Sequence, residues 1–196
     1  LMTRFILLRH GQTDWNLQRK YQGHADIPLN ETGIQQAFSA SEALRNESFD
    51  VAFSSDLTRA RTTAETVLRY HPCTPLIINS IFRERAFGVL KGTPYQRDLL
   101  NPTIRESIDR DPYGHKFDNG GESLLDVYAR ADEAYRMIRA AYPDQTVLVI
   151  SHGTFLSLFL VILKGLPISA RKGFVIDNAS PIYVGTDGET DDSVSS

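Results

Sequence analysis

The chain has 196 residues, a length that fits one globular domain, and its 41% hydrophobic content can bury a core without disulfides or metal staples. A single cysteine, Cys73, excludes an internal disulfide, and the net charge of −3 gives no sign of bulk nucleic-acid binding. The opening apolar run, 5–8, is too short for the core of a secretory signal, so we expect a cytoplasmic protein.

The N-terminal part of the chain predicts one strand and one helix joined by a long loop. Phe5–Arg9 is a short apolar run, which indicates a buried strand. A polar loop follows to about Asn30. Apolar side chains then recur at helical spacing up to Leu44, and Thr32 with Gln35 resembles a capping box at the start of this helix.

The middle of the chain predicts two more strands, a helix and an insertion. Val51–Phe53 and Leu76–Ile78 are short apolar runs, and between them a helix is expected from about Asp56 to Arg69, capped by Ser55. Residues from about 90 to 121 hold three prolines and many charges, with one weak helix after Pro102. We interpret this stretch as a cap inserted over a site.

The C-terminal part predicts two helices and two strands. Ser123, with Asp126 three residues on, starts an amphipathic helix. Val147–Ile150 indicates a buried strand, Thr154–Lys164 a buried helix, and Ile182–Val184 a last strand. Although 147–163 is apolar, it is broken by a polar turn and is shorter than the roughly 20 residues needed to cross a membrane.

Alternating strands and helices with apolar strands predict an α/β fold, a three-layer α/β/α sandwich with a mostly parallel sheet. We expect one domain over 1–196, with a small inserted cap at about 90–121 and a flexible, acidic tail at 185–196. In such sheets ligands bind at the carboxyl ends of the strands. This rule selects three places, which are Arg9-His10-Gly11, Ser54-Ser55-Asp56 and Ser151-His152-Gly153.

The residue types at these strand ends suit phosphate chemistry. A phosphate monoester repels nucleophiles, so an enzyme without metal needs fixed cations, a neutral nucleophile in line and an acid for the leaving oxygen. The arginine fork binds two phosphate oxygens, and a neutral imidazole can accept phosphate and release it to water. Nearby arginines should also lower the pKa of such a histidine.

The first strand end extends to the segment Leu-Leu-Arg-His-Gly-Gln-Thr-Asp-Trp-Asn, starting at Leu7. This segment resembles the signature of the histidine phosphatase superfamily, the branch that includes cofactor-dependent phosphoglycerate mutases and fructose-2,6-bisphosphatases. Other segments resemble the family in the same order, namely Tyr21-Gln22-Gly23, Ser54–Ala60, Arg83-Glu84, Gly121-Glu122-Ser123 and Val149–Gly153. The resemblance therefore covers most of the chain.

The resemblance implies that His10 is the nucleophile, which forms a phosphohistidine. Glu84 would give a proton to the leaving alcohol and then take one from the attacking water. The competing interpretation for Glu84 is an ion pair at the surface, because it stands between Arg83 and Arg85.

The resemblance also implies a phosphate clamp. Arg9, Arg59 and His152 would bind the phosphoryl oxygens, Asn16 would add a hydrogen bond, and the Gln22-Gly23 loop would face the substrate. Arg59 is predicted in the first turn of a helix, where a cation is unfavourable unless an anion is near, which favours the phosphate role. His152 has an alternative role as a buried core histidine.

Other polar residues carry no such signal. His24, His71 and His115 match no site motif, so we expect them at the surface, with His24 nearest the substrate loop. The acidic pairs at 109/111 and 191/192 lack a converging histidine, so no metal is expected. No P-loop lysine motif is present, and no cofactor is expected.

Three functions stay open at this stage. They are a phosphatase that acts on a small phosphorylated molecule, a phosphoglycerate mutase-type isomerase, and a non-catalytic binding module. Mutases of the family carry a longer arginine-rich insertion, whereas the stretch Thr93–Gly120 is short and its arginines are offset by acids. Lys91 also departs from the glutamate that is common there. We therefore favour the phosphatase. The sequence does not indicate the oligomeric state.

Overall fold

A computed structural model describes residues 2–185 of the chain. Its centre is a five-stranded sheet with the order β3-β2-β4-β1-β5. The strands are β1 (Arg4–Arg9), β2 (Val51–Ser54), β3 (Leu76–Ile78), β4 (Thr146–Ser151) and β5 (Ile182–Val184). Neighbouring strands run parallel except β5, which is antiparallel to β1. The predicted α/β fold with a mostly parallel sheet is confirmed.

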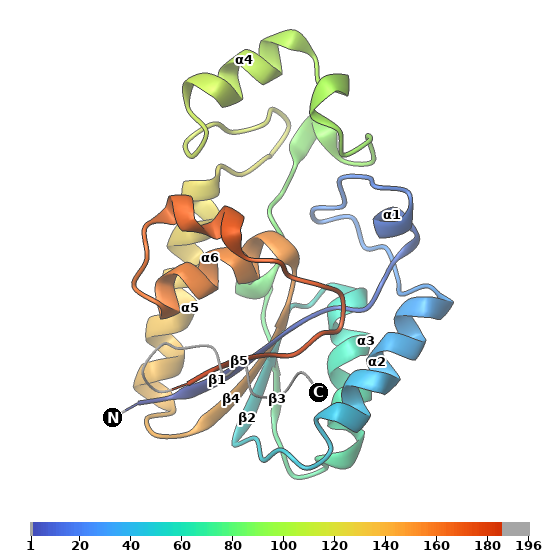
Figure 1. Cartoon of the computed structure of the whole chain (residues 1–196), viewed down its shortest axis with the longest axis vertical. Coiled ribbons are helices and arrows are strands. Elements are labelled where there is room, and N and C mark those ends of the chain that lie inside the picture. Colours follow the sequence, from blue (N-terminus) through green and yellow to red (C-terminus); the bar gives the residue numbers. More distant parts are fainter. Residues whose placement is uncertain (1, 186–196) are drawn as a thin grey trace.

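Helices cover both faces of this sheet (Figure 1). They are α1 (Asp14–Leu17), α2 (Glu31–Ala43), α3 (Thr58–Val67), α4 (Pro102–Arg110), α5 (Leu124–Ala141) and α6 (Gly153–Leu163). Helices α5 and α6 pack on one face, and α2 and α3 pack on the other. The short 3-10 turn η5 (Ile168–Gly173) packs against α6.

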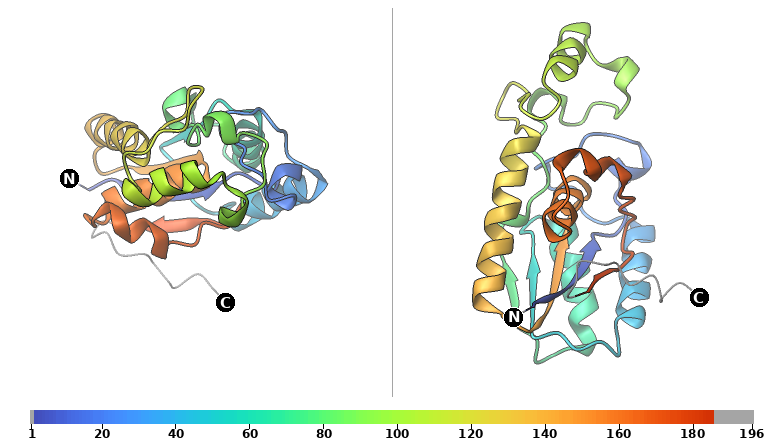
Figure 2. Two further views of the ribbon diagram at one scale, coloured as in Figure 1. Left: turned by 90° about the horizontal axis from the view of Figure 1, so that it is seen from above. Right: turned by 60° about the vertical axis from the view of Figure 1, so that its left-hand side comes forward.

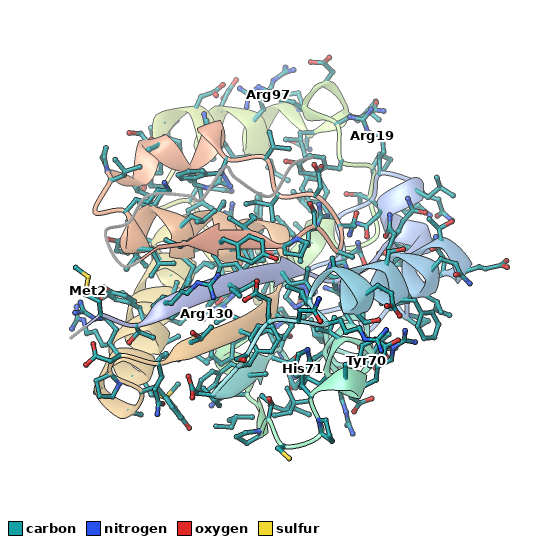
Figure 3. All side chains as sticks on the ribbon, turned by 60° about the horizontal axis from the view of Figure 1, so that its bottom comes forward. Met2, Arg19, Tyr70, His71, Arg97 and Arg130 are labelled. Carbon is teal, nitrogen blue, oxygen red and sulfur yellow. The ribbon has the colours of Figure 1, made fainter. Side chains whose placement is uncertain are left out.

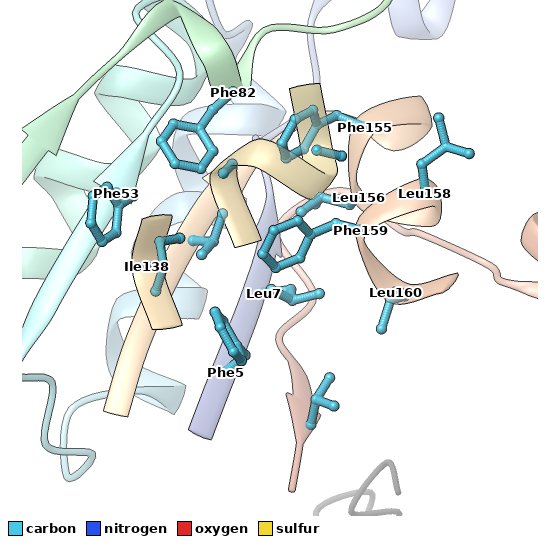
Figure 4. Close-up of a cluster of buried hydrophobic side chains, with 14 of the residues drawn as sticks. Phe5, Leu7, Phe53, Phe82, Ile138, Phe155, Leu156, Leu158, Phe159 and Leu160 are labelled. Carbon is cyan, nitrogen blue, oxygen red and sulfur yellow. The ribbon is translucent and has the colours of Figure 1, made fainter. Parts of the chain in front are cut away.

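The strands are apolar throughout because both of their faces are buried. Side chains alternate along β1, so Phe5 and Leu7 join the cluster under α5 and α6, shown in Figure 4, while Ile6 and Leu8 join the cluster under α2 and α3. Each of these four side chains is at most 2% exposed. This two-sided burial fixes the sheet and therefore the positions of the loops at its carboxyl end.

Two helix starts differ from the prediction. Helix α2 begins at Glu31, and its N-cap is Asn30, whose side chain accepts a hydrogen bond from the Gly33 amide. The expected capping box of Thr32 with Gln35 is therefore wrong, because both residues already lie inside the helix. An asparagine directly before the helix caps it two residues earlier, at the Gly33 amide.

The second difference concerns α3, which spans Thr58–Val67 rather than 56–69 and continues into a 3-10 turn, η1 (Leu68–Tyr70). Its N-cap is Leu57, which makes no side-chain cap. Ser55 accepts a long hydrogen bond from Leu57 but does not cap the helix, and its hydroxyl also lies 2.9 Å from Nε2 of His152. The predicted Ser55 cap is wrong, since the Ser55 hydroxyl contacts the His152 ring and does not cap the helix.

The cap lies beyond the carboxyl ends of the strands, as Figures 1 and 2 show. It contains α4 and the turns η3 (Gly88–Leu90) and η4 (Arg97–Leu99). Leu90, Leu100 and Phe117 form a small hydrophobic cluster that is separate from the two clusters beside the sheet, so the cap has a hydrophobic core of its own. Turn η2 (Ser80–Phe82) leads from the sheet toward it. Apart from Gly185, the predicted flexible tail lies outside the described residues.

The apolar stretch at 147–163 is strand β4 and helix α6, as predicted. The break between them at His152 is the turn that leads from the sheet to the helix. Among residues 2–185, no helix has the length and the apolar character needed to cross a bilayer.

Candidate active site

The site is built where three parallel strands end side by side. Arg9 of β1 pairs in register with Ser151 of β4, so the residues that follow these strands, His10 and His152, become neighbours. Their ring centroids lie 5.1 Å apart, and the His10 amide donates to the Ser151 carbonyl at 3.1 Å. The end of β2 brings Ser55 to His152. The predicted convergence of the three strand ends is therefore observed.

The glycine after His10 allows the loop to approach helix α2 closely. A Cβ atom on Gly11 would lie 2.3 Å from the Gly33 carbonyl oxygen, and one on Gly33 would lie 2.0 Å from the carbonyl oxygen of Gln12. No side chain fits at either position without a shift of the backbone. The two glycines therefore let the loop after His10 pack directly against the start of α2.

His10 is held as a neutral ring with one nitrogen available. Its side chain is buried, and Nδ1 lies 2.6 Å from the Gly11 carbonyl oxygen, an acceptor that requires a proton on Nδ1. The unprotonated nitrogen is therefore Nε2. Burial lowers the pKa of His10 well below its ordinary value, and the charges of Arg59 and Arg9 lower it further.

His152 lies behind His10, away from the cavity wall. It is fully buried, and burial together with the charge of Arg59 lowers its pKa well below the ordinary value. Its Nε2 contacts the Ser55 hydroxyl, whereas Nδ1 is buried with no hydrogen-bond partner in the described part of the chain. The hydrogen-bonding capacity of this ring is therefore satisfied by the described residues at Nε2 only.

Arg59 is fully buried, and burial lowers its pKa to about 10. Its guanidinium donates to the carbonyl oxygens of Gly23 and Ala25, while its buried Nε has no partner among the described residues. The anion expected at this helix start is Asp26, whose carboxylate accepts from both the amide and the hydroxyl of Thr58. The position of Arg59 in the first turn of α3 is therefore not evidence that it binds phosphate. The evidence for that role is that Arg59 lines the cavity.

Arg9 approaches the same space from β1. One of its Nη atoms donates to the Ile176 carbonyl, and its buried Nε has no partner within residues 2–185. Burial lowers its pKa, and the carboxylate of Glu84 opposes that shift. A Cβ atom on Gly153 would lie 3.7 Å from the Arg9 guanidinium carbon and 3.9 Å from the carboxylate of Glu84. A glycine thus leaves room between the cation and the acid.

The carboxylate of Glu84 lies at the N-terminus of α6. It accepts hydrogen bonds from the amides of Thr154 and Phe155, at 3.1 and 3.3 Å, and from the amide of Arg85 at 2.8 Å. Amides at a helix start are free to bind an anion, so these contacts orient the carboxylate toward the cavity that it lines. The alternative of a surface ion pair is wrong for this residue.

The neighbours of Glu84 are occupied elsewhere. Arg83 makes a two-pronged ion pair with Asp56, and Arg85 donates to main-chain oxygens. Arg130 of α5 donates to the carbonyls of Arg83 and Glu84 and pairs with the carboxylate of Glu122. This framework fixes the main chain that carries the acid.

The amides of Asn16 and Gln22 also line the cavity. The Asn16 side-chain oxygen accepts from the Thr13 amide within the capping box of α1, and the Gln22 oxygen lies 2.9 Å from the Thr13 hydroxyl. Their oxygens are thus used inside the protein, which leaves their NH2 groups as donors. Gly23 lines the cavity as well, with φ +53 and its carbonyl bound to Arg59.

These residues surround one cavity of about 550 Å³. Seven of the eight predicted site residues line it, and the exception is His152, which reaches it only through His10. The cavity walls also contain residues that the sequence analysis did not select, namely Trp15, Arg19, Lys20, Tyr21, Phe87, Tyr95, Thr154, Ser157, Arg171, Lys172, Phe174 and Ile176. Trp15 and Tyr21 stand in the quoted motif segments, whereas Arg19 and Lys20 after α1, and Arg171 and Lys172 of η5, stand where no motif marks them.

Of the three histidines expected at the surface, one is exposed and two are partly buried. His24 is exposed and lies 2.7 Å from the Glu84 carbonyl, while His71 and His115 are partly buried outside the cavity. In the cap, Phe117 and Tyr113 pack against hydrophobic clusters. Tyr95 is 58% exposed and lines the cavity.

The lowered histidine pKa values predict a loss of stability in acid. Above the ordinary pKa of about 6.5, His10 and His152 are neutral in both folded and unfolded protein. Below it, only the unfolded chain takes up these protons, so the free energy of unfolding should fall by up to about 1.4 kcal/mol per pH unit for each histidine. Urea unfolding of wild type and His10→Asn, in phosphate-free buffers from about pH 7.5 to about pH 5.5, measures this. If the free energy of unfolding fell as steeply with pH in His10→Asn as in wild type, the lowered pKa of His10 would be contradicted.

The comparisons with known proteins agree with this geometry. Residues 5–195 match the model of the histidine phosphatase superfamily (branch 1). Within the described residues, no cluster of histidine, cysteine and acidic side chains is placed to hold a metal ion. The chain is 35% identical over 164 residues to "Uncharacterized phosphatase PhoE" of Bacillus subtilis, which covers 84% of this chain and 79% of that protein. It is 31% identical over 183 residues to "Probable phosphoglycerate mutase GpmB" of Erwinia tasmaniensis, covering 91% and 83%.

Solved structures give the same result. A putative alpha-ribazole-5'-P phosphatase from Escherichia coli superimposes with a TM-score of 0.82 at 31% identity, over 95% of this chain and 93% of that one. The family model spans nearly the whole chain, and the ordered strand-end motifs fall in the matched region. The chain therefore belongs to the histidine phosphatase superfamily, branch 1.

Proposed function

We propose that the protein is a metal-independent phosphatase that hydrolyses small-molecule phosphate monoesters through a phosphohistidine at His10. The observation that carries the proposal is the neutral, buried His10 ring, which shares one cavity with the guanidinium groups of Arg9 and Arg59 and with the carboxyl group of Glu84. These groups supply a nucleophile, two cations for the phosphoryl oxygens and an acid.

In the first step the phosphoryl group moves to the enzyme. Nε2 of His10 attacks phosphorus, the bond from phosphorus to the ester oxygen breaks, and Glu84 gives a proton to that oxygen so that a neutral alcohol leaves. Arg9 and Arg59 neutralise the equatorial oxygens, and the amide donors of Asn16 and Gln22 bind the phosphoryl group. His152 supports the ring of His10 from behind.

In the second step water restores the enzyme. Glu84, now a carboxylate, takes a proton from a water molecule, whose oxygen attacks phosphorus as the bond to Nε2 breaks. Inorganic phosphate leaves, His10 is neutral again and Glu84 is protonated for the next cycle. The same two arginines serve both steps because the phosphoryl oxygens stay in one place.

The alternative is a mutase, in which a hydroxyl of the bound substrate accepts the phosphoryl group. The similar proteins are named both ways, PhoE as a phosphatase and GpmB as a probable mutase. Two features favour hydrolysis. The cap is short, and its Arg97 pairs with Asp109 rather than lining the cavity. Lys91 stands where mutases of the family commonly carry glutamate.

The test is phosphate release from para-nitrophenyl phosphate by the purified protein in the presence of a chelator. We expect turnover that the chelator does not reduce, because the cavity supplies its own cations. A second assay follows interconversion of 2- and 3-phosphoglycerate with added bisphosphoglycerate. Turnover that depends on a metal would contradict the proposed mechanism, and interconversion faster than hydrolysis would make the protein a mutase.

A further inference from the structure

The rim of the cavity carries positive charge that the phosphate mechanism does not use. The basic residues in the cavity wall are Arg9, Arg19, Lys20, Arg59, Arg171 and Lys172, and the acidic residue in the wall is Glu84. Arg9 and Arg59 are assigned to the transferred phosphoryl group, which leaves four cations. This excess of positive charge at the cavity wall contrasts with the net charge of −3 of the whole chain.

The first pair comes from η5, which places Arg171 and Lys172 next to each other at the wall. Neither forms an ion pair within residues 2–185, and Nε of Arg171 is buried there without a hydrogen-bond partner. Arg171 lies near Arg85, whose pKa is lowered to about 10 by burial and then by the charge of Arg171. Two neighbouring cations and an unpaired buried donor favour the binding of an anion.

The second pair, Arg19 and Lys20, stands on the loop that follows α1, and the main chain of this loop is hydrogen-bonded to residues 92–95. The Arg19 carbonyl accepts from the Tyr95 amide, and the main chain around Tyr21 exchanges two hydrogen bonds with that of Gly92 and Thr93. Arg19 adopts a left-handed conformation, φ 54, at the turn that starts this contact. Figure 3 shows Arg19 at the same end of the molecule as Arg97 of the cap, opposite to His71.

The cavity is also much larger than a phosphate group needs. Its 550 Å³ falls in the range of roughly 300–1,000 Å³ that holds whole small-molecule ligands. Trp15, Tyr21 and Phe87 contribute apolar surface to its wall. Tyr21 is packed against Phe87 and Tyr95, with ring centroids 4.8 and 4.7 Å apart, so this surface is preformed.

We propose that Arg171 and Lys172, facing the cavity together with Arg19 and Lys20, form a second anion site, and that the preferred substrates carry a carboxylate or a second phosphate besides the phosphoryl group that is transferred to His10. This inference rests on the proposed function and narrows its substrate class. The arginines of the stretch Thr93–Gly120 are offset by acids, as the sequence indicates, but the four cations of this site lie outside that stretch.

The test compares substrates that differ only in the second charge. One pair is 3-phosphoglycerate and glycerol 3-phosphate, in which a carboxylate replaces a hydroxymethyl group. The longer pair is 4-carboxyphenyl phosphate and its neutral 4-carbamoyl analogue. We expect kcat/KM to favour the charged member by about tenfold in at least one pair, which is the size of one charge-assisted hydrogen bond. Fructose 1,6-bisphosphate against fructose 6-phosphate distinguishes a second phosphate from a carboxylate.

Substitutions then assign the preference to the rim. Arg171→Gln should lower the ratio of kcat/KM for the charged substrate to kcat/KM for the neutral one by about tenfold, and Lys172→Gln should lower it by about threefold. Both substitutions should change kcat/KM for the neutral substrate less. Arg110→Gln removes the same charge from an exposed position on the cap and should leave the ratio unchanged. A wild-type ratio near one in all pairs, or a ratio that Arg171→Gln leaves unchanged, would overturn the second anion site.

Binding provides a readout that does not depend on turnover. Trp15 is the only tryptophan in the chain and it lines the cavity, so its fluorescence should report occupancy in His10→Ala protein. We expect this protein to bind 3-phosphoglycerate or 4-carboxyphenyl phosphate about tenfold more tightly than the matched neutral analogue. If the wild type hydrolyses nothing, the proposed function fails, and this binding ratio still decides the anion site. Equal affinities for the charged and the neutral member of each pair would contradict the second anion site.

Discussion

Replacing His10 by alanine is expected to lower kcat/KM for para-nitrophenyl phosphate by about 10⁴-fold or more, the loss typical of an enzyme without its nucleophile. Within the described part of the cavity wall, His10 is the one neutral imidazole, and the cations around it have no nucleophile to assist once it is gone. The residual rate should be close to that of the reaction without enzyme. Initial rates across a range of substrate concentrations give the measurement.

The matched control is His71→Ala, since His71 packs near Phe49 and the Leu44 carbonyl, outside the cavity. It should keep kcat/KM within about twofold of wild type, even if it costs some stability. Circular dichroism should show both variants folded. A His10→Ala protein that is folded and still turns over at a tenth of the wild-type rate would remove His10 from the mechanism.

Glu84→Gln is expected to produce the second large effect, and its size should depend on the leaving group. Glutamine keeps a carbonyl oxygen that can accept from the amides at the start of α6, but it cannot give a proton to the leaving oxygen. For a simple alkyl phosphate we expect a loss of about 10²- to 10⁴-fold in kcat. For para-nitrophenyl phosphate, whose leaving group needs little protonation, the loss in the first step should be much smaller.

The measurement is a series of aryl and alkyl phosphates with leaving groups of increasing basicity, assayed under conditions where the first step limits the rate. The slope of log kcat/KM against leaving-group basicity should be steeper in Glu84→Gln than in wild type. Glu106→Gln, on the exposed face of α4, is the control and should keep the wild-type slope. Equal losses across the whole series would show that Glu84 does not act as the acid.

The sequence predicted the sheet and the nucleophile region because both depend on local patterns. The apolar runs of β1, β2 and β4 mark buried strands, and each run is followed directly by the polar residues of the site. Parallel strands bring their carboxyl ends to one edge, so the neighbourhood of His10 and His152 follows from topology alone. The predicted start of α5, with Ser123 and Asp126 in a capping box, is confirmed. The starts of α2 and α3 were predicted less well, since several polar residues near Asn30 and Ser55 could each serve as the cap.

The rest of the site depends on contacts distant in sequence. The anchoring of Glu84 by the amides of α6 joins residues 70 positions apart, and no spacing in the sequence indicates it. Arg171 and Lys172 lie in a turn after α6 that shows no motif, and only the packing of η5 brings them to the cavity. Arg59 was predicted from the resemblance, but its complete burial and its bonds to Gly23 and Ala25 were not.

The central claim is that a phosphoryl group resides on His10 during turnover. The most direct measurement mixes the enzyme with a good substrate, stops the reaction with base after a few milliseconds and maps the phosphate by mass spectrometry. We predict a phosphate that is stable in base and labile in acid, on the peptide that contains His10 and on no other peptide. Hydrolysis at full rate with no phosphorylated intermediate, or with an acid-stable phosphate on another residue, would contradict the account.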